Sequence, residues 1–395
     1  MEFDQVQPRK NTYSIKWDGA AAVYHHKEVL PMWIADMDFQ SPPAVVKAIC
    51  EQAQRGIYGY VTEPQTTRVP QVIADWLQKQ NDWQINRHFL GYSAGVVNGL
   101  SLAIRALTQE GDAIITQTPL YGHFQSAVES SKRRLVTNPL HQHNGRYEFD
   151  WQLFEQQIQT KQVKMAILCN PHNPTGRVWT IAELKQFAQI CERHQVIILS
   201  DDIHSDLILP GYHYQPLAKV YPEYQDQIIT FKSPSKTFNL AGLQFAYYYT
   251  TNKQYRQQMT QQAAYACDPD LPTAFALPAV IAAYEQSDEW LLDLLCYLKD
   301  NLQWMTAQIE TTTAAKVTRS EATYLSWIDV SYLRVSEKAL QTALADHGVG
   351  LQTNEDFGLS AKDGLFIRLN FATARKTLEE GVNRLIEALQ SLEHK

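Results

Sequence analysis

A lysine flanked by two serines follows a short apolar stretch, in the order Ser233, Pro234, Ser235, Lys236. The apolar residues 228–231 predict a buried strand that ends just before it. The two hydroxyls and nearby backbone N–H groups can hold an anion. Lys236 is the side chain in this segment that can form a Schiff base with an aldehyde. A polar turn with a solvated lysine accounts for the segment equally well when it is considered alone, so the other strand ends must decide.

An acidic residue ends another apolar run. Residues 196–200 lead into Asp201, and His204 follows in the same turn. A carboxylate that emerges from a buried strand needs a cation or hydrogen-bond donors. Asp201 can therefore hold a protonated pyridine nitrogen, with His204 near a neighbouring ring oxygen; helix capping and ordinary packing are the alternatives. A divalent metal is disfavoured, because three acids and one histidine in consecutive turn positions give poor coordination geometry.

A turn of small residues opens a predicted helix after the apolar residues 89–93. It contains Gly95, Val96 and Val97. Backbone N–H groups at the start of a helix have no partner within the helix and lie at the positive end of its dipole, which suits phosphate. Many strand-to-helix turns contain glycine, so the phosphate interpretation depends on what lies around this turn.

Two further strand ends carry side chains that suit a flat ring. Tyr121 follows residues 113–117 and can stack on a ring, although ordinary packing is the better explanation on local evidence. Asn173 follows residues 164–169 in a turn with two prolines, and its amide can reach a ring hydroxyl; a simple turn-forming asparagine is the alternative. An Asn–Pro bond in such a turn is also a candidate cis peptide.

An arginine lies within a late apolar run. Arg368 is part of the predicted strand over residues 364–371. A buried guanidinium needs a carboxylate, which comes either from the protein or from a ligand. A salt bridge within the protein is the commoner explanation when Arg368 is considered alone.

Apolar runs alternate with helical segments through the middle of the chain. The predicted strands are residues 89–93, 113–117, 134–138, 164–169, 196–200, 228–231 and 245–250. The predicted helices between them are residues 97–108, 122–131, 151–159 and 181–194. This alternation predicts an α/β fold with a mostly parallel seven-stranded sheet covered by helices on both faces. Ligands of such sheets bind at the carboxyl ends of the strands, where the residues described above lie.

The last part of the chain changes character. Strands and helices alternate there without the long buried runs, which predicts a smaller α+β domain. We expect residues 1–45 to join this smaller domain, residues 46–285 to form the large ligand-binding domain, and residues 286–395 to form the smaller one.

Composition excludes several classes of function. The chain has 395 residues, 45% of them hydrophobic, and a net charge of −7 without a long basic run, so nucleic-acid binding is not expected. Its five cysteines form no Cys-x-x-Cys pair, which argues against a disulfide framework or a zinc site. No secretory signal and no run of 18 apolar residues is present, so we expect a cytoplasmic protein without membrane spans.

Taken in order along the chain, these features resemble the fold-type I pyridoxal 5′-phosphate (PLP) enzymes of the aspartate aminotransferase superfamily. Within it, residues 31–39, 58–60, 200–206 and 367–371 look like the bacterial cystathionine β-lyase and C–S lyase subgroup, the MalY/PatB type. The resemblance covers nearly the whole chain. It implies contacts with PLP from Gly95, Val96, Val97, Tyr121, Asn173, Asp201, His204, Ser233, Ser235 and Lys236.

The resemblance also implies a role for most of these positions. Lys236 would be the Schiff-base lysine and the general base, and Asp201 would pair with the pyridinium nitrogen. Tyr121 would stack on the ring, and Asn173 and His204 would lie near the ring hydroxyl. The catalytic set implied is therefore Lys236, Tyr121 and Asp201.

Other implied contacts involve the substrate and a second subunit. Arg368 would bind the substrate α-carboxylate, with Trp33 and Asn173 also at the substrate. Tyr60 would reach the phosphate in the neighbouring subunit, which implies a homodimer. One position departs from the pattern: many relatives have an arginine eight residues after the lysine as a phosphate ligand, and this chain has Gln244.

The activity that the resemblance implies is α,β-elimination. The substrate would be cystathionine or another L-cysteine S-conjugate, cleaved to a thiol (homocysteine from cystathionine), pyruvate and ammonia. Residues of this kind also permit transamination, so an aminotransferase for aromatic or neutral amino acids is an alternative. A PLP-binding regulatory protein is a second alternative, from another class.

Overall fold

The computed structural model describes residues 3–143, 145–265 and 272–393. Its largest sheet has eight strands in the order β2-β9-β8-β7-β6-β3-β4-β5. The strands are β2 (Leu90–Ser93), β3 (Ala113–Thr118), β4 (Arg134–His143), β5 (Arg146–Phe149), β6 (Val163–Cys169), β7 (Ile197–Asp201), β8 (Ile228–Lys232) and β9 (Ala246–Tyr249). The five central strands, β8-β7-β6-β3-β4, are parallel to one another, and β9 is antiparallel to both of its neighbours.

The predicted α/β fold is confirmed, and each of the seven predicted strands is present. The predicted strand count was wrong by one. Strand β4 continues to His143 and pairs with β5 in an antiparallel hairpin at the sheet edge. Tyr147 and Phe149 are buried while Glu148 between them is exposed, so β5 shows the alternation of an edge strand and not the continuous apolar run that identified the others.

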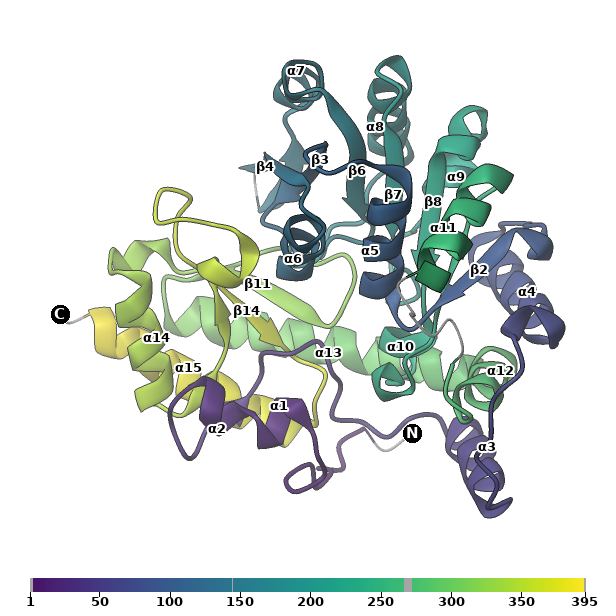
Figure 1. Ribbon diagram of the computed structural model, residues 1–395. Helices are drawn as coiled ribbons and strands as arrows, with labels where there is room; N and C mark the ends of the chain where they lie inside the picture. The colour runs from purple at the N-terminus through teal and green to yellow at the C-terminus, as the bar shows by residue number, and fades with distance from the viewer. Residues whose placement is uncertain (1–2, 144, 266–271, 394–395) are drawn as a thin grey trace.

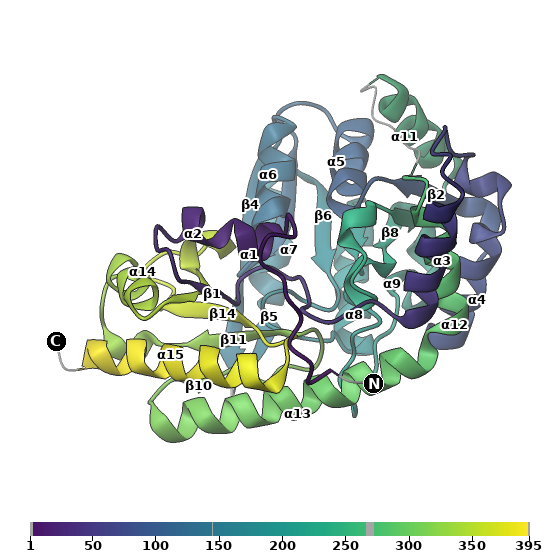
Figure 2. The same ribbon diagram turned by 90° about the horizontal axis from the view of Figure 1, so that it is seen from below.

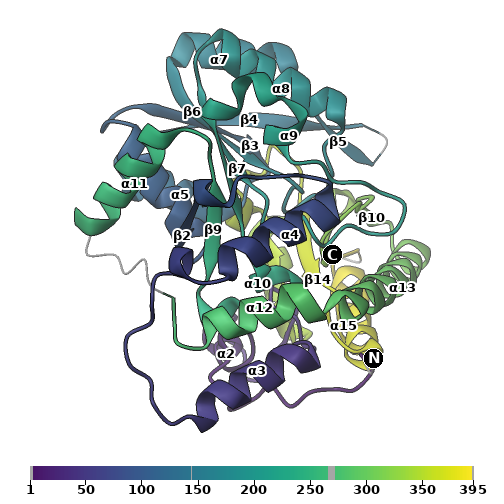
Figure 3. The ribbon, with the colours of Figure 1, turned by 90° about the vertical axis from the view of Figure 1, so that its right-hand side faces the viewer.

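Both faces of the sheet are buried, because alternate residues of its strands enter two different cores. In β6, Met165 and Ile167 pack in one core, whereas Ala166 and Leu168 pack in the other. Figure 3 shows α7, α8 and α9 along one face and α5 and α11 along the other. The helices of this part are α3 (Pro43–Gln54), α4 (Val69–Asn81), α5 (Val96–Leu107), α6 (Gly122–Ser130), α7 (Trp151–Lys161), α8 (Ile181–Arg193), α9 (Leu217–Val220), α10 (Pro234–Thr237), α11 (Lys253–Tyr265) and α12 (Ala276–Gln286).

A smaller α+β part lies beside the large sheet, at the lower left of Figure 1. Its antiparallel sheet has the order β10-β11-β14-β13. These strands are β10 (Lys316–Val317), β11 (Leu325–Asp329), β13 (Gln352–Thr353) and β14 (Phe366–Asn370). The helices of this part are α13 (Asp288–Thr312), α14 (Glu337–Asp346) and α15 (Arg375–Glu393), and Figure 2 shows α13 and α15 lying side by side.

The N-terminal segment lies against this smaller part. It contains α1 (Ile15–Asp18), α2 (Ala20–Val23) and β1 (Leu30–Pro31), and β1 pairs in parallel with β12 (Val349–Gly350). The domain limits at residues 45 and 285 stay a prediction, as does the cytoplasmic location. Among the described residues, the helices include none that is both long and apolar enough to cross a membrane.

Candidate active site

A cavity of about 200 Å³ lies at the carboxyl ends of the central parallel strands. It therefore occupies the edge of the sheet where ligands of such folds bind. The residues predicted from the sequence that line it are Gly95, Val96, Val97, Tyr121, Asn173, Asp201, His204, Ser235 and Lys236. Segments far apart in the chain thus contribute to one small space, which makes it the candidate active site.

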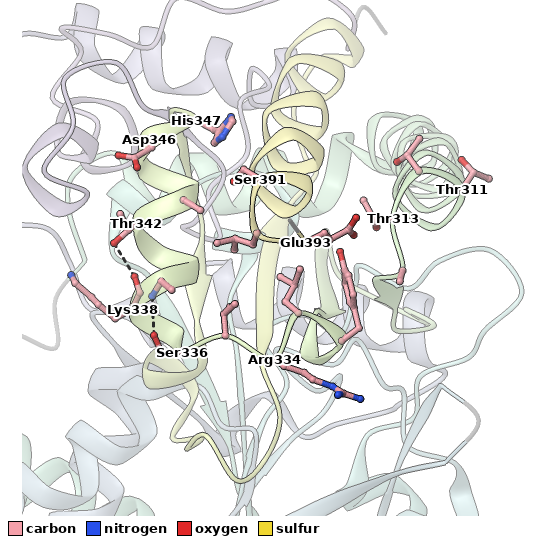
Figure 4. A pocket seen from close by; sticks show the side chains of 18 residues that line it. Thr311, Thr313, Arg334, Ser336, Lys338, Thr342, Asp346, His347, Ser391 and Glu393 are labelled. Carbon is pink, nitrogen blue, oxygen red and sulfur yellow. Dashed lines mark hydrogen bonds between the residues drawn. The ribbon is translucent and has the colours of Figure 1, made fainter. Parts of the chain in front are cut away.

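A larger hollow of about 1360 Å³ lies elsewhere, between the end of α13, α14 and the end of α15 (Figure 4). None of the predicted site residues lines it. Two hydroxyls that border it bond to the backbone of α14: Thr342 Oγ1 donates to the Lys338 carbonyl, and Oγ of the N-cap Ser336 accepts from the Ala339 N–H. Size alone does not identify a site, and this hollow is not the candidate.

Lys236 lies on α10, directly after β8. Its Nζ donates a hydrogen bond to the Ala35 carbonyl at 2.7 Å. Removal from water lowers the pKa of Lys236 from 10.5 to about 8, because desolvation disfavours the charged ammonium form. Roughly one fifth of this amine is therefore neutral at about pH 7.4, far more than of an exposed lysine, which favours a role as general base.

The two serines before Lys236 have different surroundings. Ser235 lines the cavity, whereas Ser233 does not. Ser233 caps α10: its Oγ accepts from the Ser235 N–H at 3.0 Å and donates to the Phe245 carbonyl at 2.6 Å. In this arrangement the one hydroxyl proton of Ser233 is used by the Phe245 carbonyl, and its contact with a phosphate stays a prediction.

Asp201 is a buried carboxylate without a cationic partner. It is the last residue of β7, and among the described residues no cation lies within 4.0 Å of it; its Oδ1 accepts from the Ile203 N–H at 3.1 Å. Burial raises the pKa of Asp201 to about 7. His204 is also buried, its Nδ1 lacks a hydrogen-bond partner, and burial lowers its pKa to about 3, so the imidazole is neutral.

The start of α5 supplies unpaired backbone donors. Gly95 precedes the helix with φ of 124°, a conformation that favours glycine, and no side chain caps the helix. The cavity is lined here by Gly95, Val96, Val97 and Asn98, so the free N–H groups of the first turn lie at its wall. Gln244 lines the same cavity, and the predicted departure from the arginine pattern therefore falls within the site.

Arg368 connects the smaller sheet to the cavity. It lies on β14, and its Nη1 donates to Asn173 Oδ1 at 2.8 Å. Nη2 donates to the Trp33 carbonyl at 2.9 Å and also to Gln352 Oε1. The buried Nε has no partner, and within the described part of the chain no carboxylate lies within 4.0 Å of the guanidinium. The salt bridge that the sequence left open is therefore absent there, and burial lowers the pKa of Arg368 to about 10.

Three predicted contacts involve aromatic residues, and only one of them lines the cavity. Tyr121 does so, and burial raises its pKa to about 12, so its hydroxyl stays protonated. The Trp33 side chain lines a separate hollow and donates its indole N–H to the Lys16 carbonyl at 3.1 Å. Tyr60 is fully exposed and lies outside the cavity of its own chain.

The sequence did not identify several residues that complete the site. Ala35 supplies the carbonyl that holds Lys236, and the Cys169 thiol lines the cavity and donates to the Pro171 carbonyl at 3.3 Å. A backbone carbonyl leaves no signal in residue type. The Asn173–Pro174 peptide is cis, as the turn composition predicted.

Comparison with known proteins agrees with this geometry. The family model for aminotransferase class I and II matches residues 27–385. The chain belongs to this family. It is 35% identical to cystathionine beta-lyase PatB of Bacillus subtilis (strain 168) over 98% of this chain and 100% of that protein. It is 30% identical to protein MalY of Escherichia coli (strain K12), over 99% of each chain.

A solved structure of the same kind is the PLP-bound C–S lyase from Staphylococcus hominis. It has a TM-score of 0.90 and 32% identity, with 98% of each chain covered. The resemblance to the MalY/PatB type within the aminotransferase class I and II family is thus confirmed. Among the described residues there is no cluster of three or more His, Cys, Asp or Glu side chains that could hold a metal ion.

The unpaired Asp201 leads to a test of stability against pH. Its pKa rises from 3.8 to about 7 on folding, so between these values the folded chain holds a proton that the unfolded chain has released, and stability falls as pH rises. We expect Asp201→Asn, without bound ligand, to match the wild type near about pH 4 and to be more stable by ~1–3 kcal/mol above about pH 7. Urea unfolding at both pH values measures this. A less stable variant above neutral pH would mean that the carboxylate has a cationic partner in the folded chain.

Proposed function

We propose that this chain is a PLP-dependent C–S β-lyase. It cleaves cystathionine or another L-cysteine S-conjugate to a thiol, pyruvate and ammonia. The observation that carries the proposal is the cavity in which Lys236 and the unpaired Asp201 face the start of α5. The full-length similarity to proteins named cystathionine β-lyase and C–S lyase supports the choice of reaction.

The residues present fit PLP. The buried Asp201 carboxylate lacks a cation and suits a protonated pyridine nitrogen. His204 Nδ1 lacks a partner and can meet a ring oxygen. The unpaired N–H groups of Gly95, Val96 and Val97, with the Ser235 hydroxyl, suit the phosphate. When bound, PLP supplies an electron sink for the pair left behind when a substrate Cα–H bond breaks.

The reaction then depends on where this chain holds protons and charges. Arg368 binds the α-carboxylate of the amino acid. Its Nε, which has no hydrogen-bond partner among the described residues, is the donor left for this contact. Lys236, with a pKa of about 8, takes the proton from Cα. The Cα electron pair then forms a Cα–Cβ double bond as the Cβ–S bond breaks with its electron pair on sulfur, and the thiolate takes up a proton. The enamine that remains reacts with one water to give pyruvate and ammonia. Tyr121 stays protonated and covers the ring.

Transamination is the second candidate, because the family to which the chain belongs is that of the class I and II aminotransferases. The same residues remove the same proton in both reactions. The two differ in whether the sulfur leaves or a proton returns to the cofactor, and only the transaminase needs a 2-oxo acid as an amino-group acceptor.

Product analysis separates the two reactions. We expect the purified enzyme to release homocysteine, pyruvate and ammonia in equal amounts from cystathionine without any 2-oxo acid. Lys236→Ala is the control, and we expect it to lose both turnover and the visible Schiff-base absorbance, because the base and the aldehyde partner are the same amine. Strict dependence on an added 2-oxo acid would make the protein an aminotransferase. Absence of turnover on any amino acid, with cofactor bound, would remove both enzyme proposals.

Arg368 allows a second test. We expect Arg368→Ala to raise KM for amino-acid substrates about 10- to 100-fold, because a charge-assisted hydrogen bond contributes roughly 1.5–3 kcal/mol. Folding should be retained, since no carboxylate of the described chain depends on this cation. Thermal unfolding followed by circular dichroism provides the check. If the variant fails to fold, so that its KM cannot be measured, Arg368 has a structural role instead.

We also propose a homodimer in which each subunit completes the site of the other. Tyr60 is fully exposed in the single chain, and its neighbours Ile57 and Tyr58 are 78% and 58% exposed. Aromatic and aliphatic side chains gathered on one loop are typical of a surface that a partner covers. Covered by a second subunit, this loop would bring Tyr60 to the phosphate end of the neighbouring cavity.

Mixed dimers test this arrangement. A dimer of one Lys236→Ala subunit and one Tyr60→Ala subunit has one site with both changes and one site with neither, if Tyr60 acts across the interface. Co-expression should then restore about one quarter of wild-type activity, since half of the dimers are mixed and each has one intact site. Activity no higher than the mean of the two separate variants would show that sites are not shared.

A further inference from the structure

Two functional cations in the site are bound by the same short piece of backbone. The Trp33 carbonyl accepts from Arg368 Nη2 at 2.9 Å, and the Ala35 carbonyl accepts from Lys236 Nζ at 2.7 Å. The two acceptors are separated by one residue in a segment that bends at Ile34 and Ala35, where the Asp36 N–H donates to the Ile34 carbonyl at 2.8 Å. The position of the base relative to the carboxylate anchor therefore depends on residues 33–36.

The other two carbonyls of that segment share one side-chain donor, Asn370. Asn370 Nδ2 donates to the Ile34 carbonyl at 2.6 Å and to the Asp36 carbonyl at 2.8 Å. Asn370 is 1% exposed, and its Oδ1 accepts from the Ala372 N–H at 2.8 Å, so each of its polar atoms is engaged. It lies on β14, two residues after the arginine.

A buried ion pair holds the same segment from the N-terminal side. Lys16 is 1% exposed; its Nζ donates to Asp38 Oδ2 at 2.8 Å and to the Asp36 carbonyl at 2.9 Å. Arg9 binds the Asp36 and Asp38 carboxylates at 2.8 and 3.0 Å. Such pairs are retained only where their hydrogen bonds are satisfied, as they are here, and their removal leaves an uncompensated charge.

We propose that Asn370, supported by Lys16, is a positioning residue that sets the catalytic base against the carboxylate anchor. The inference rests on the proposed function, in which Lys236 removes the Cα proton. A neutral amine that donates one N–H to the Ala35 carbonyl has its lone pair directed away from that carbonyl. The Tyr324 hydroxyl also donates to this oxygen, at 3.2 Å, and limits its movement. Asn370 binds the carbonyls on either side of Ala35 and so holds the Ala35 carbonyl in place. The Ala35 carbonyl in turn orients the lone pair of Lys236.

The chain contains a matched control. Asn301 is likewise fully buried, and its Nδ2 also donates to two backbone carbonyls, those of Phe371 and Thr373, at 3.2 and 3.0 Å. Its Oδ1 accepts from Arg375 Nε at 2.9 Å. Asn301→Ala therefore removes the same kind of contacts as Asn370→Ala, but on a segment that holds neither Lys236 nor Arg368.

Kinetics of the holoenzyme provide the first test. We expect Asn370→Ala to lower kcat about tenfold and to increase the isotope effect of α-deuterated substrate, because one misplaced hydrogen bond slows proton removal itself. Lys16→Met, which keeps the aliphatic stem, should change both quantities in the same direction. Asn301→Ala should change kcat less than about twofold and leave the isotope effect unchanged. Its melting temperature should nevertheless fall about as much as that of Asn370→Ala. Equal isotope effects in the two asparagine variants would overturn the proposal.

Chemical labelling tests the contact itself, independently of the reaction. In the full-length chain freed of cofactor, Lys236 has a free amine, and its acetylation by acetic anhydride can be followed by mass spectrometry. We expect about fivefold faster labelling in Asn370→Ala and Lys16→Met than in the wild type, through loss of the hydrogen bond to the Ala35 carbonyl. Asn301→Ala should label at the wild-type rate. Equal labelling rates in all four proteins would overturn the proposed role of Asn370. Failure of the lyase assay alone would leave this result standing and reject only the proposed reaction.

Discussion

The cost of burying an unpaired charge governs the arrangement of this protein. Asp201 and Arg368 are both almost fully removed from water, and within the described chain neither has an oppositely charged partner within 4.0 Å. Such groups destabilise a fold by several kcal/mol unless something compensates them. In the proposed function, a pyridinium ring would compensate Asp201 and a substrate carboxylate would compensate Arg368. Asp201 lines the cavity itself, whereas Arg368 lies behind Asn173, to whose Oδ1 it donates at 2.8 Å.

This constraint explains why the site needs two sheets. The parallel sheet ends in Asp201, and its other strand ends supply Lys236 and the free N–H groups of α5. In the proposed function these groups would hold the cofactor, so a substrate carboxylate would need a second cation. The second cation comes from β14 of the smaller sheet, and the Arg368–Asn173 hydrogen bond joins the two parts at the cavity. The mechanism therefore depends on contacts between distant parts of the chain.

How much of the site the sequence could predict depends on whether a residue follows a buried strand. Strands buried on both faces appear as continuous apolar runs, so their ends, and hence Lys236, Asp201 and Asn173, could be placed by counting along the chain. The hairpin strand β5 lacks such a run and was missed. For Ser233 the residue type suggested a phosphate donor, but its hydroxyl bonds to the Phe245 carbonyl. That contact joins residues twelve positions apart, and only the folded chain decides which acceptor the hydroxyl meets.

Backbone acceptors are the part of the site that residue types cannot reveal. The Trp33 carbonyl and not its indole contacts Arg368, and the Ala35 carbonyl contacts Lys236, so both residues act through groups that every amino acid carries. Their effect comes from where the segment is held. Asn370, on β14, is hydrogen-bonded to this segment. A shift of the smaller sheet would therefore move Arg368 and the acceptor of Lys236 together. In the proposed function, this single connection would align substrate and base, in place of two independent contacts that would each have to be ordered on binding.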